Sequence, residues 1–413
     1  MRRKRQSYIP VRKRELMAAL AAAVDRKIAQ PALFRRMTAL LGAIIHHEYY
    51  DELETLKDTY ALFEKSHPAD PAADAKGVQA LRQEMQEVLR QANFDEISPD
   101  DLSACEGETK QKQVRTKAPR WHYEEVRFFS RGMHIGSETV PRFFGLFSRQ
   151  QDVEVYDDVV LYVRFRKDDP KDKSQRPLPA GAVPGTVLMK AFHDIPVHDI
   201  CLLYPDIRIQ ITRADAFLLG APALAGAVPI LLNILPALSV IFVLGGAFLG
   251  YEGTVSDSQM KQAIGALAVL FGAGAFAFRQ YSNYTFKKLK YQKRVADNVY
   301  FRNASNNAGV FESLIGAAEE QDTKEALIAY MILVTQGTKT QENLDSAAED
   351  WLRRTFKMDI DFEIGDALAK LERLKLVTRA GPYLTAVPVR EGLARLAAHW
   401  DNIYDAEGRE QTA

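Results

Sequence analysis

The chain is poor in the residues that build disulfide-rich or metal-centred domains. Its 413 residues include only two cysteines, Cys105 and Cys201, which lie far apart and lack a C-x-x-C spacing. This excludes a disulfide framework or a zinc ribbon and suits a reducing compartment. An excess of one charge is lacking too, because 54 Lys and Arg balance 54 Asp and Glu. Bulk charge therefore favours neither a nucleic acid nor a basic ligand.

Glycine-rich phosphate-binding loops are also missing. The glycines at 181 and 185 enclose Ala-Val-Pro and fit neither G-x-G-x-x-G nor G-K-[ST]. We therefore expect no cofactor, and we assign no catalytic, cofactor-binding or metal-binding residue.

Charge disappears completely from one long segment, residues 216–251, which are mostly Ala, Leu, Val, Ile, Phe and Gly. Its most apolar window, Ile230–Gly250, has the length of about 20 residues that a membrane-spanning helix needs. A second uncharged window, Gln262–Phe278, lies between Lys261 and Arg279. These two windows predict a two-helix transmembrane hairpin over residues 216–280.

Basic residues follow the hairpin at Lys287, Lys288, Lys290, Lys293 and Arg294, whereas the connector between the windows has no Lys or Arg before Lys261. By the positive-inside rule, both soluble regions then lie on the cytoplasmic side. We predict a bacterial inner (plasma) membrane with N- and C-termini cytoplasmic, or the mitochondrial inner membrane in a eukaryote. The five cations are predicted to contact anionic lipid headgroups.

The N-terminus carries seven Lys or Arg and no acid in residues 1–14, followed by an apolar stretch at 16–24. This resembles a signal peptide, but Ile9-Pro10-Val11 interrupts the basic stretch and Asp25-Arg26-Lys27 directly follows the apolar one. We expect an uncleaved basic leader before an amphipathic helix. The leader is then either a solvated tail or a lipid contact.

The remaining patterns predict an α+β membrane protein. We expect a basic leader (1–14), a helical region (15–110), a small mixed α/β region (111–215), the hairpin, a basic stalk (281–300) and a C-terminal domain (301–413). In the mixed region, β-branched and aromatic residues favour strands at 126–131, 153–166 and 187–192, with a short helix at 196–203.

The C-terminal domain has the element order of a winged helix. Apolar spacing predicts helices at 324–336, 344–356 and 364–374, then a hairpin around Ala380-Gly381-Pro382 and a helix at 390–404. Residues 305–413 contain 12 Lys or Arg and 19 Asp or Glu, a net charge of −7. Because phosphate neutralisation supplies most nucleic-acid affinity, this charge favours a protein contact over DNA.

Three groups of residues invite a chemical interpretation. His193-Asp194 and His198-Asp199 look like metal-binding pairs, but Pro196 separates them, so we expect a turn with Asp199 capping a helix. The adjacent His46 and His47 point about 100° apart on a helix, which favours a packed interface over a metal site. Cys201 lacks a visible oxyanion hole or orienting partner, so a small apolar core residue is expected.

Two segments that flank the hairpin resemble a known family. Residues 192–209 fit the pattern F-x-x-I-P-x-x-D-x-x-x-L-x-P-D-x-x-V, except for Ile209 in the last place. Residues 306–330 fit N-N-x-G-V…A-E-E-x-x-x-K-E-A-L-x-x-Y. Both patterns resemble the transmembrane protein 143-like proteins, which carry a domain of unknown function (number 3754). The resemblance implies a membrane protein and carries over no catalytic residue.

These observations favour a membrane-anchored adaptor or regulatory protein that binds an unknown protein partner and anionic lipids. They leave a homo-oligomer open. One alternative is a membrane enzyme acting on a lipid or interfacial metabolite, with residues 185–215 as its site. A second alternative is a membrane-tethered DNA-binding regulator. No nucleic acid is expected, given the acidic C-terminal domain.

Overall fold

The computed structural model describes residues 5–64 except 26 and 29, then 71–104, 115–117, 120–142, 147–167, 177–205 except 180, 207–210 and 257–410, with scattered positions between 228 and 250. Two compact units divide the chain, and both are discontinuous. Unit 1 combines Met1–Pro99, Arg120–Val197 and Arg302–Ala413, and unit 2 combines Asp100–Pro119 and His198–Phe301.

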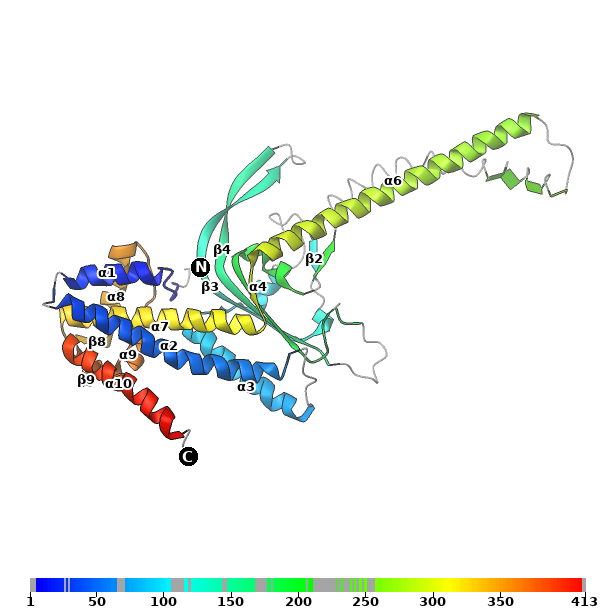
Figure 1. The fold of residues 1–413 in the computed structure, drawn as a ribbon. Helices are drawn as coiled ribbons and strands as arrows, with labels where there is room; N and C mark the ends of the chain where they lie inside the picture. The colour runs from blue at the N-terminus through cyan, green and yellow to red at the C-terminus, as the bar shows by residue number, and fades with distance from the viewer. Residues whose placement is uncertain are drawn as a thin grey trace. The chain divides into compact units, whose positions relative to one another are not determined.

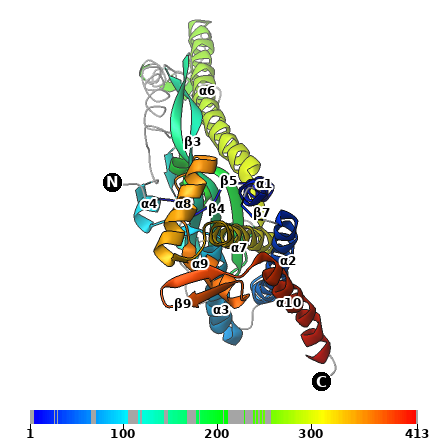
Figure 2. The ribbon, with the colours of Figure 1, turned by 90° about the vertical axis from the view of Figure 1, so that its left-hand side faces the viewer.

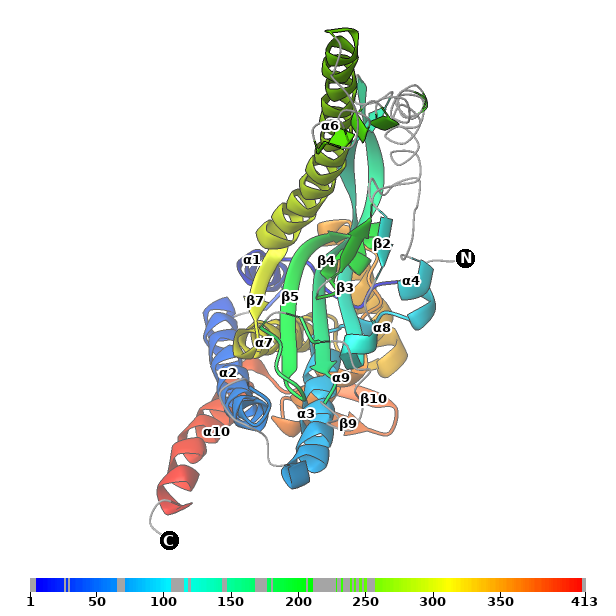
Figure 3. The same cartoon turned by 90° about the vertical axis from the view of Figure 1, so that its right-hand side faces the viewer.

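Unit 1 contains an antiparallel five-stranded sheet with the order β1-β3-β4-β5-β7. Figure 3 shows its longer strands side by side. The strands are β1 (Asp95–Glu96), β3 (Tyr123–Arg142), β4 (Phe147–Phe165), β5 (Val187–Pro196) and β7 (Asn303–Asn306), and the short η1 (Arg120–His122) precedes β3. Each strand predicted in the mixed region lies within or almost entirely within one of them. Side chains such as Phe129, Val160 and Met189 on one face join the main hydrophobic core.

Helix α7 (Ala308–Gln336) is the centre of this core. Every residue from Gln321 to Leu333 is buried, because α1 (Lys13–Asp25), α2 (Pro31–Ala61), α3 (Pro71–Gln91) and the sheet all pack on it. Figure 1 shows α1 and α2 beside α7, and Figure 2 looks along α7 with its neighbours around it. A helix that is apolar on all sides is expected to be covered in this way.

The C-terminal part of unit 1 follows the predicted order. Helix α7 leads into β8 (Lys339–Thr340), α8 (Gln341–Phe356), α9 (Ile364–Arg373), the hairpin β9 (Val377–Ala380) and β10 (Tyr383–Ala386), and α10 (Val389–Glu410). The three strands form a sheet with the order β8-β10-β9. Thr340 caps α8 by accepting a hydrogen bond from the Asn343 N–H at 3.3 Å.

Unit 2 contains most of α4 (Pro99–Ala104), η3 (Val197–Leu203), the paired strands β2 (Arg115–Lys117) and β6 (Arg208–Gln210), and helix α6 (Asp257–Arg302). Because α6 is continuous over 46 residues, the second predicted membrane window and the predicted stalk form one helix. Most of the first window, Ile230–Gly250, lies outside the described residues. In the part of the chain that the structure describes, one helical stretch, Met260–Lys290, is long and apolar enough to cross a membrane.

The mixed α+β character predicted from the sequence is confirmed. The compact units, however, do not follow the six predicted segments. The helices of the N-terminal region, the sheet and the C-terminal domain share one core, since α7 packs against all three. The N-terminal helices and one face of the sheet therefore contribute to a core that they share with the C-terminal elements.

Candidate functional site

A polar stretch interrupts the apolar sequence of α7 at the point where α7 is most deeply buried. Five consecutive side chains, Gln321, Asp322, Thr323, Lys324 and Glu325, are each between 1% and 7% exposed. Polar groups at this depth destabilise a fold unless they have partners. The partners of Gln321, Asp322, Lys324 and Glu325 therefore show which segments this part of the molecule holds.

Gln321 and Lys324 hold the backbone of the N-terminal segment (Arg5–Val11). The Gln321 side-chain amide accepts from the Ile9 N–H at 3.2 Å and donates to the Ile9 carbonyl at 3.3 Å. The Lys324 Nζ donates to the same carbonyl at 2.9 Å and pairs with Glu320 at 2.9 Å. Burial lowers the pKa of Lys324, although Glu320 opposes this shift.

Asp322 points toward two other elements. Its carboxylate accepts a hydrogen bond from the Tyr49 hydroxyl of α2 and forms an ion pair with Lys370 of α9. The Lys370 Nζ also lies 4.9 Å from the centre of the Tyr49 ring. Burial and the neighbouring Asp322 charge raise the pKa of Tyr49, so this phenol stays protonated. The group joins α2, α7 and α9.

Glu325, unlike Asp322, has no cation bonded to it among the contacts of the described residues. Among these residues, its hydrogen bond comes from the Asn93 side-chain amide at 3.4 Å. Burial, with the charges of Asp322 and Glu363 adding to it, raises the pKa of Glu325 well above its usual range. The structure therefore favours a protonated carboxyl at this position.

A row of charged side chains crosses the sheet close to the N-terminal segment. Arg131, Asp158 and His193 are direct cross-strand neighbours on β3, β4 and β5. The Arg131 Nε donates to Asp158 at 2.9 Å, and the His193 Nδ1 is bonded to the other oxygen of the same carboxylate. Arg131 also lies over the Tyr8 ring, 4.4 Å from its centre.

The imidazole ring of His193, which belongs to this row, lies at the surface. The hydrogen bond to Asp158 raises the pKa of His193, whose side chain is 62% exposed. Although burial opposes it, bonding to His193 and the Arg131 charge lower the pKa of Asp158. An imidazole held at Nδ1 by a carboxylate has Nε2 available for proton transfer. Sequence reasoning singled out His193 but missed Asp158, whose only signal was an acidic pair inside a strand.

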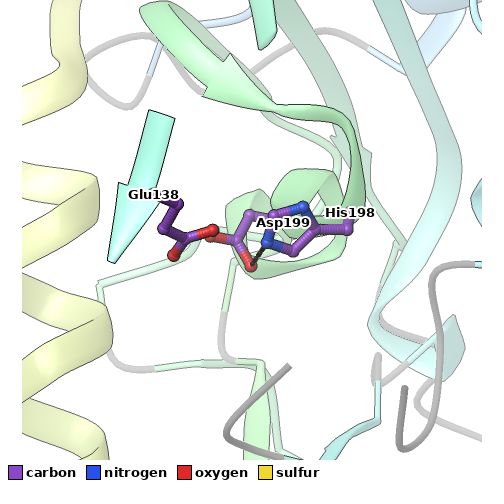
Figure 4. A group of neighbouring side chains, drawn as sticks. All are labelled: Glu138, His198 and Asp199. Atoms are coloured by element: carbon purple, nitrogen blue, oxygen red, sulfur yellow. Dashed lines mark ion pairs between the residues drawn. The ribbon is translucent and has the colours of Figure 1, made fainter. Parts of the chain in front are cut away.

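The two predicted His-Asp pairs lie in different units. His193 pairs with Asp158 in unit 1, and Asp194 has a left-handed backbone with φ of 54°. In unit 2, the His198 Nε2 lies 3.7 Å from Asp199, the ion pair dashed in Figure 4. Glu138, also labelled there, lies on β3 of unit 1.

The other sequence candidates have structural partners. The His46 Nδ1 is bonded to Glu319 at 2.8 Å, although the His46 side chain is 70% exposed, and the His47 ring lies 6.1 Å from that of Trp400. Cys201 is fully buried, as expected, and its Sγ lies 3.4 Å from the Leu102 carbonyl oxygen. Cys105 lies outside the described residues.

The predicted lipid contacts all lie on α6. Lys288, Lys290 and Lys293 are exposed, and Lys287 and Arg294 occupy the same helical stretch. Large apolar side chains on the same helix are exposed too, among them Phe271 (77%), Phe278 and Phe286. The helix thus exposes apolar residues first and cations after them.

The basic leader differs most from the sequence prediction. From Arg5 onward it is neither a solvated tail nor a lipid contact, because Ile9 and Val11 are buried in the main core. Arg5 pairs with Glu349 at 2.9 Å, and Lys13 with Glu319 at 3.5 Å. These cations neutralise the acidic C-terminal part of the chain itself.

The fold is that of a mixed α+β protein, and the residues that the structure describes include one candidate membrane helix. Residues 156–309 match a family model described as a protein of unknown function (DUF3754). The match runs from β4 through α6 to the start of α7. No solved structure matches the chain.

Proposed function

We propose that this protein is a membrane-anchored adaptor related to the transmembrane protein 143-like proteins. The observation that carries the proposal is helix α6, whose most apolar 18-residue stretch is only 11% buried. A core helix of a soluble protein would be covered, and a signal sequence would lie near the N-terminus. A bilayer is the natural cover for such a helix.

The residues that follow the apolar stretch support an orientation. Tyr281 and Tyr284 are exposed at its C-terminal end, followed by the exposed Lys288, Lys290 and Lys293. Aromatic residues prefer the membrane–water interface, and lysines accumulate on the cytoplasmic side. On this proposal the end of α6 that leads into unit 1 lies at the cytoplasmic surface.

The discontinuity of unit 1 supports a hairpin. Its parts come from both before and after α6, and they share one core. Both must therefore lie on the same side of any membrane, so the chain between them crosses an even number of times. The uncharged residues 216–251 supply a suitable return span.

The C-terminal elements support protein contact over DNA binding. We infer a winged-helix-like module from the helix order and the strand order β8-β10-β9. Helix α9, which follows α8 as a recognition helix would, has its charges engaged internally: Lys370 with Asp322, Arg373 with Glu48, and Asp366 with Arg90. Together with the net charge of −7, this leaves little to attract phosphate.

A membrane enzyme is the second candidate, and the Asp158–His193 pair favours it. An exposed imidazole oriented by a carboxylate is a common general base. If this candidate holds, His193→Asn abolishes a cellular phenotype without lowering the amount of protein in the membrane. An unchanged phenotype removes the candidate.

The test of the anchor is alkaline carbonate extraction of membranes that contain the full chain, with tags at both termini. We expect the protein to stay in the membrane pellet and both tags to be accessible from the same side. Release into the supernatant, or tags on opposite sides, contradicts the proposal.

The role of the α6 lysines is tested by the orientation of the protein in the membrane. Replacing Lys288, Lys290 and Lys293 by Gln weakens the positive-inside signal and should produce a detectable fraction of inverted molecules. The matched control replaces three exposed arginines of unit 1, Arg36, Arg354 and Arg390, and should leave the orientation unchanged. Equal inversion in both variants would show that overall charge, and not position on α6, matters.

A further inference from the structure

The N-terminal segment is held as a bound peptide is held. It has no helix, and its only strand-like pairing is a parallel bridge between Gln6 and Ile360. The Gln6 carbonyl accepts from the Asp361 N–H at 2.8 Å, and the Gln6 side chain donates to the Met133 carbonyl at 2.9 Å. Main-chain hydrogen bonds of this kind give affinity to an extended ligand.

The groups that receive this segment come from three separate parts of unit 1, and we call them the seam. They are Arg131 and Met133 on β3, Gln321 and Lys324 on α7, and Ile360 with Asp361 between α8 and α9. Gln321 contacts both the N–H and the carbonyl of Ile9, so it recognises backbone and not a particular side chain.

Side-chain positions of the segment fit distinct surroundings. Arg5 lies among acids, 2.9 Å from Glu349 and 3.3 Å from Asp359. Tyr8 lies between two cations, with Arg131 at 4.4 Å and Lys324 at 6.0 Å from its ring centre. Ile9 is fully buried, whereas Pro10 faces solvent. The seam therefore selects a basic residue, an aromatic residue three positions later and an aliphatic residue next.

The seam cannot stay empty without penalty. Removal of the segment takes away the three hydrogen bonds that Gln321 and Lys324 make to the Ile9 backbone, and it uncovers the apolar surface on which Ile9 and Val11 are buried. Any process that withdraws residues 5–11 therefore creates a site that demands another extended chain.

We propose that the seam is an exchangeable peptide-binding site, and that its partner ligand is an extended protein segment with a basic-x-x-aromatic-aliphatic pattern. The chain's own residues 5–11 occupy the site in the absence of the partner. The inference rests on the adaptor proposal, because it names the chemistry of the partner. A tethered occupant has a high effective concentration, so the partner has to be held nearby, as proteins in one membrane are.

The test uses the full chain in detergent, with a protease recognition site inserted between Val11 and Arg12. After cleavage, a dye-labelled peptide of residues 1–11 is added and its binding is followed by fluorescence anisotropy. We expect saturable uptake, at least tenfold weaker for the Ile9→Asp peptide and within twofold for the Pro10→Ala peptide. In the chain, Gln321→Ala weakens uptake, and the exposed Gln341→Ala is its matched control.

A second experiment, on the uncleaved chain, applies if cleavage unfolds the protein. The uncleaved Ile9→Asp chain has a weakened occupant, so the wild-type peptide added in trans should raise its melting temperature, whereas the Ile9→Asp peptide should not. Failure of both uptake and rescue overturns the proposal, as does equal binding of the Ile9→Asp peptide. Carbonate extraction is unaffected by these variants, so this failure is distinct from failure of the membrane anchor.

The partner pattern has its own test. A peptide of unrelated sequence that keeps the basic-x-x-aromatic-aliphatic spacing should compete with the labelled peptide within tenfold, and a shuffled peptide should not. If only the native sequence competes, the ligand is the same segment of a second copy, and the assignment to a different partner is wrong.

Discussion

Helices α6 and α7 follow each other almost directly in the chain, and both are rich in apolar residues, yet their surroundings are opposite. In α7 the apolar side chains are buried on all sides and even five consecutive polar residues are covered. In α6 large apolar side chains such as Phe271 and Phe278 are exposed. Sequence hydrophobicity alone therefore does not tell whether the protein covers an apolar helix or leaves it exposed.

The difference between them lies in the polar residues. Charges within α7 have protein partners from distant segments, such as Ile9, Tyr49 and Lys370. Charges of α6 are concentrated at its ends and after its apolar stretch, where a bilayer would leave them in water. The position of charge relative to the apolar stretch is thus the more informative pattern.

The largest expected effect is the loss of stability when a phenylalanine is replaced by alanine, which should differ between the two helices. Phe311 of α7 is fully buried and packs edge-on against Tyr60 with ring centres 5.2 Å apart. Phe311→Ala should lower the free energy of unfolding of unit 1 by about 3–5 kcal/mol. Phe271→Ala in α6 should change it by less than about 0.5 kcal/mol. Denaturant unfolding followed by tryptophan fluorescence checks both values, and equal losses would contradict the comparison.

An intermediate effect concerns the buried carboxyl of α7. The pKa of Glu325 is raised in the folded chain, so folding takes up a proton and stability falls as pH rises above the unfolded pKa of about 4.3. Glu325→Gln keeps an acceptor for Asn93 and removes the titration. We expect the Glu325→Gln chain to be more stable than the wild type at pH 7, because it lacks the carboxyl whose charged form is disfavoured by burial.

Unfolding curves between pH 4 and pH 8 measure this effect. The stability of the Glu325→Gln chain should depend less on pH over this range than that of the wild type. The exposed Glu342→Gln is the control and should leave the wild-type slope in place. A variant that is less stable than wild type at pH 7 would show that Glu325 is ionised and paired.

The smallest effect compares two tyrosine hydroxyls. The Tyr330 hydroxyl of α7 donates to the Val387 carbonyl at 2.7 Å in the core. Tyr330→Phe leaves that carbonyl unpaired and should cost about 1–2 kcal/mol. Tyr281→Phe on α6, where the ring is 68% exposed, should cost nothing measurable. Thermal unfolding distinguishes the two, and a neutral Tyr330→Phe would imply that water replaces the hydroxyl.

Elements whose pattern is local could be predicted from the sequence. The spacing of Ala367, Leu368 and Leu371 places α9, and Gly381, with φ of 61°, forms the turn between β9 and β10. The alternating apolar residues of β4 and β5 likewise predicted strands. In each case the information lies within about one turn or one strand of the residue concerned.

The buried polar contacts could not be predicted, because they join distant residues. Ile9 and Lys324 are 315 positions apart, and nothing near either residue indicates the other. The one signal was the E-E-x-x-x-K-E pattern at 319–325, which placed several charges inside an apolar helix. The basic leader was misjudged for the same reason, since its acidic partners Glu349 and Asp359 lie near the opposite end of the chain.

The placement of residues 5–11 in the core of unit 1 also sets the order of events during synthesis. The ribosome makes Ile9 more than 300 residues before Gln321, which binds its backbone. Throughout that interval Ile9, Val11 and much of α2 lack the helix that covers them. Such a chain exposes apolar surface for a long time and depends on contacts of high sequence separation. We therefore expect a nascent chain to need a chaperone until α7 emerges, and a stop codon after α6 to leave an insoluble product.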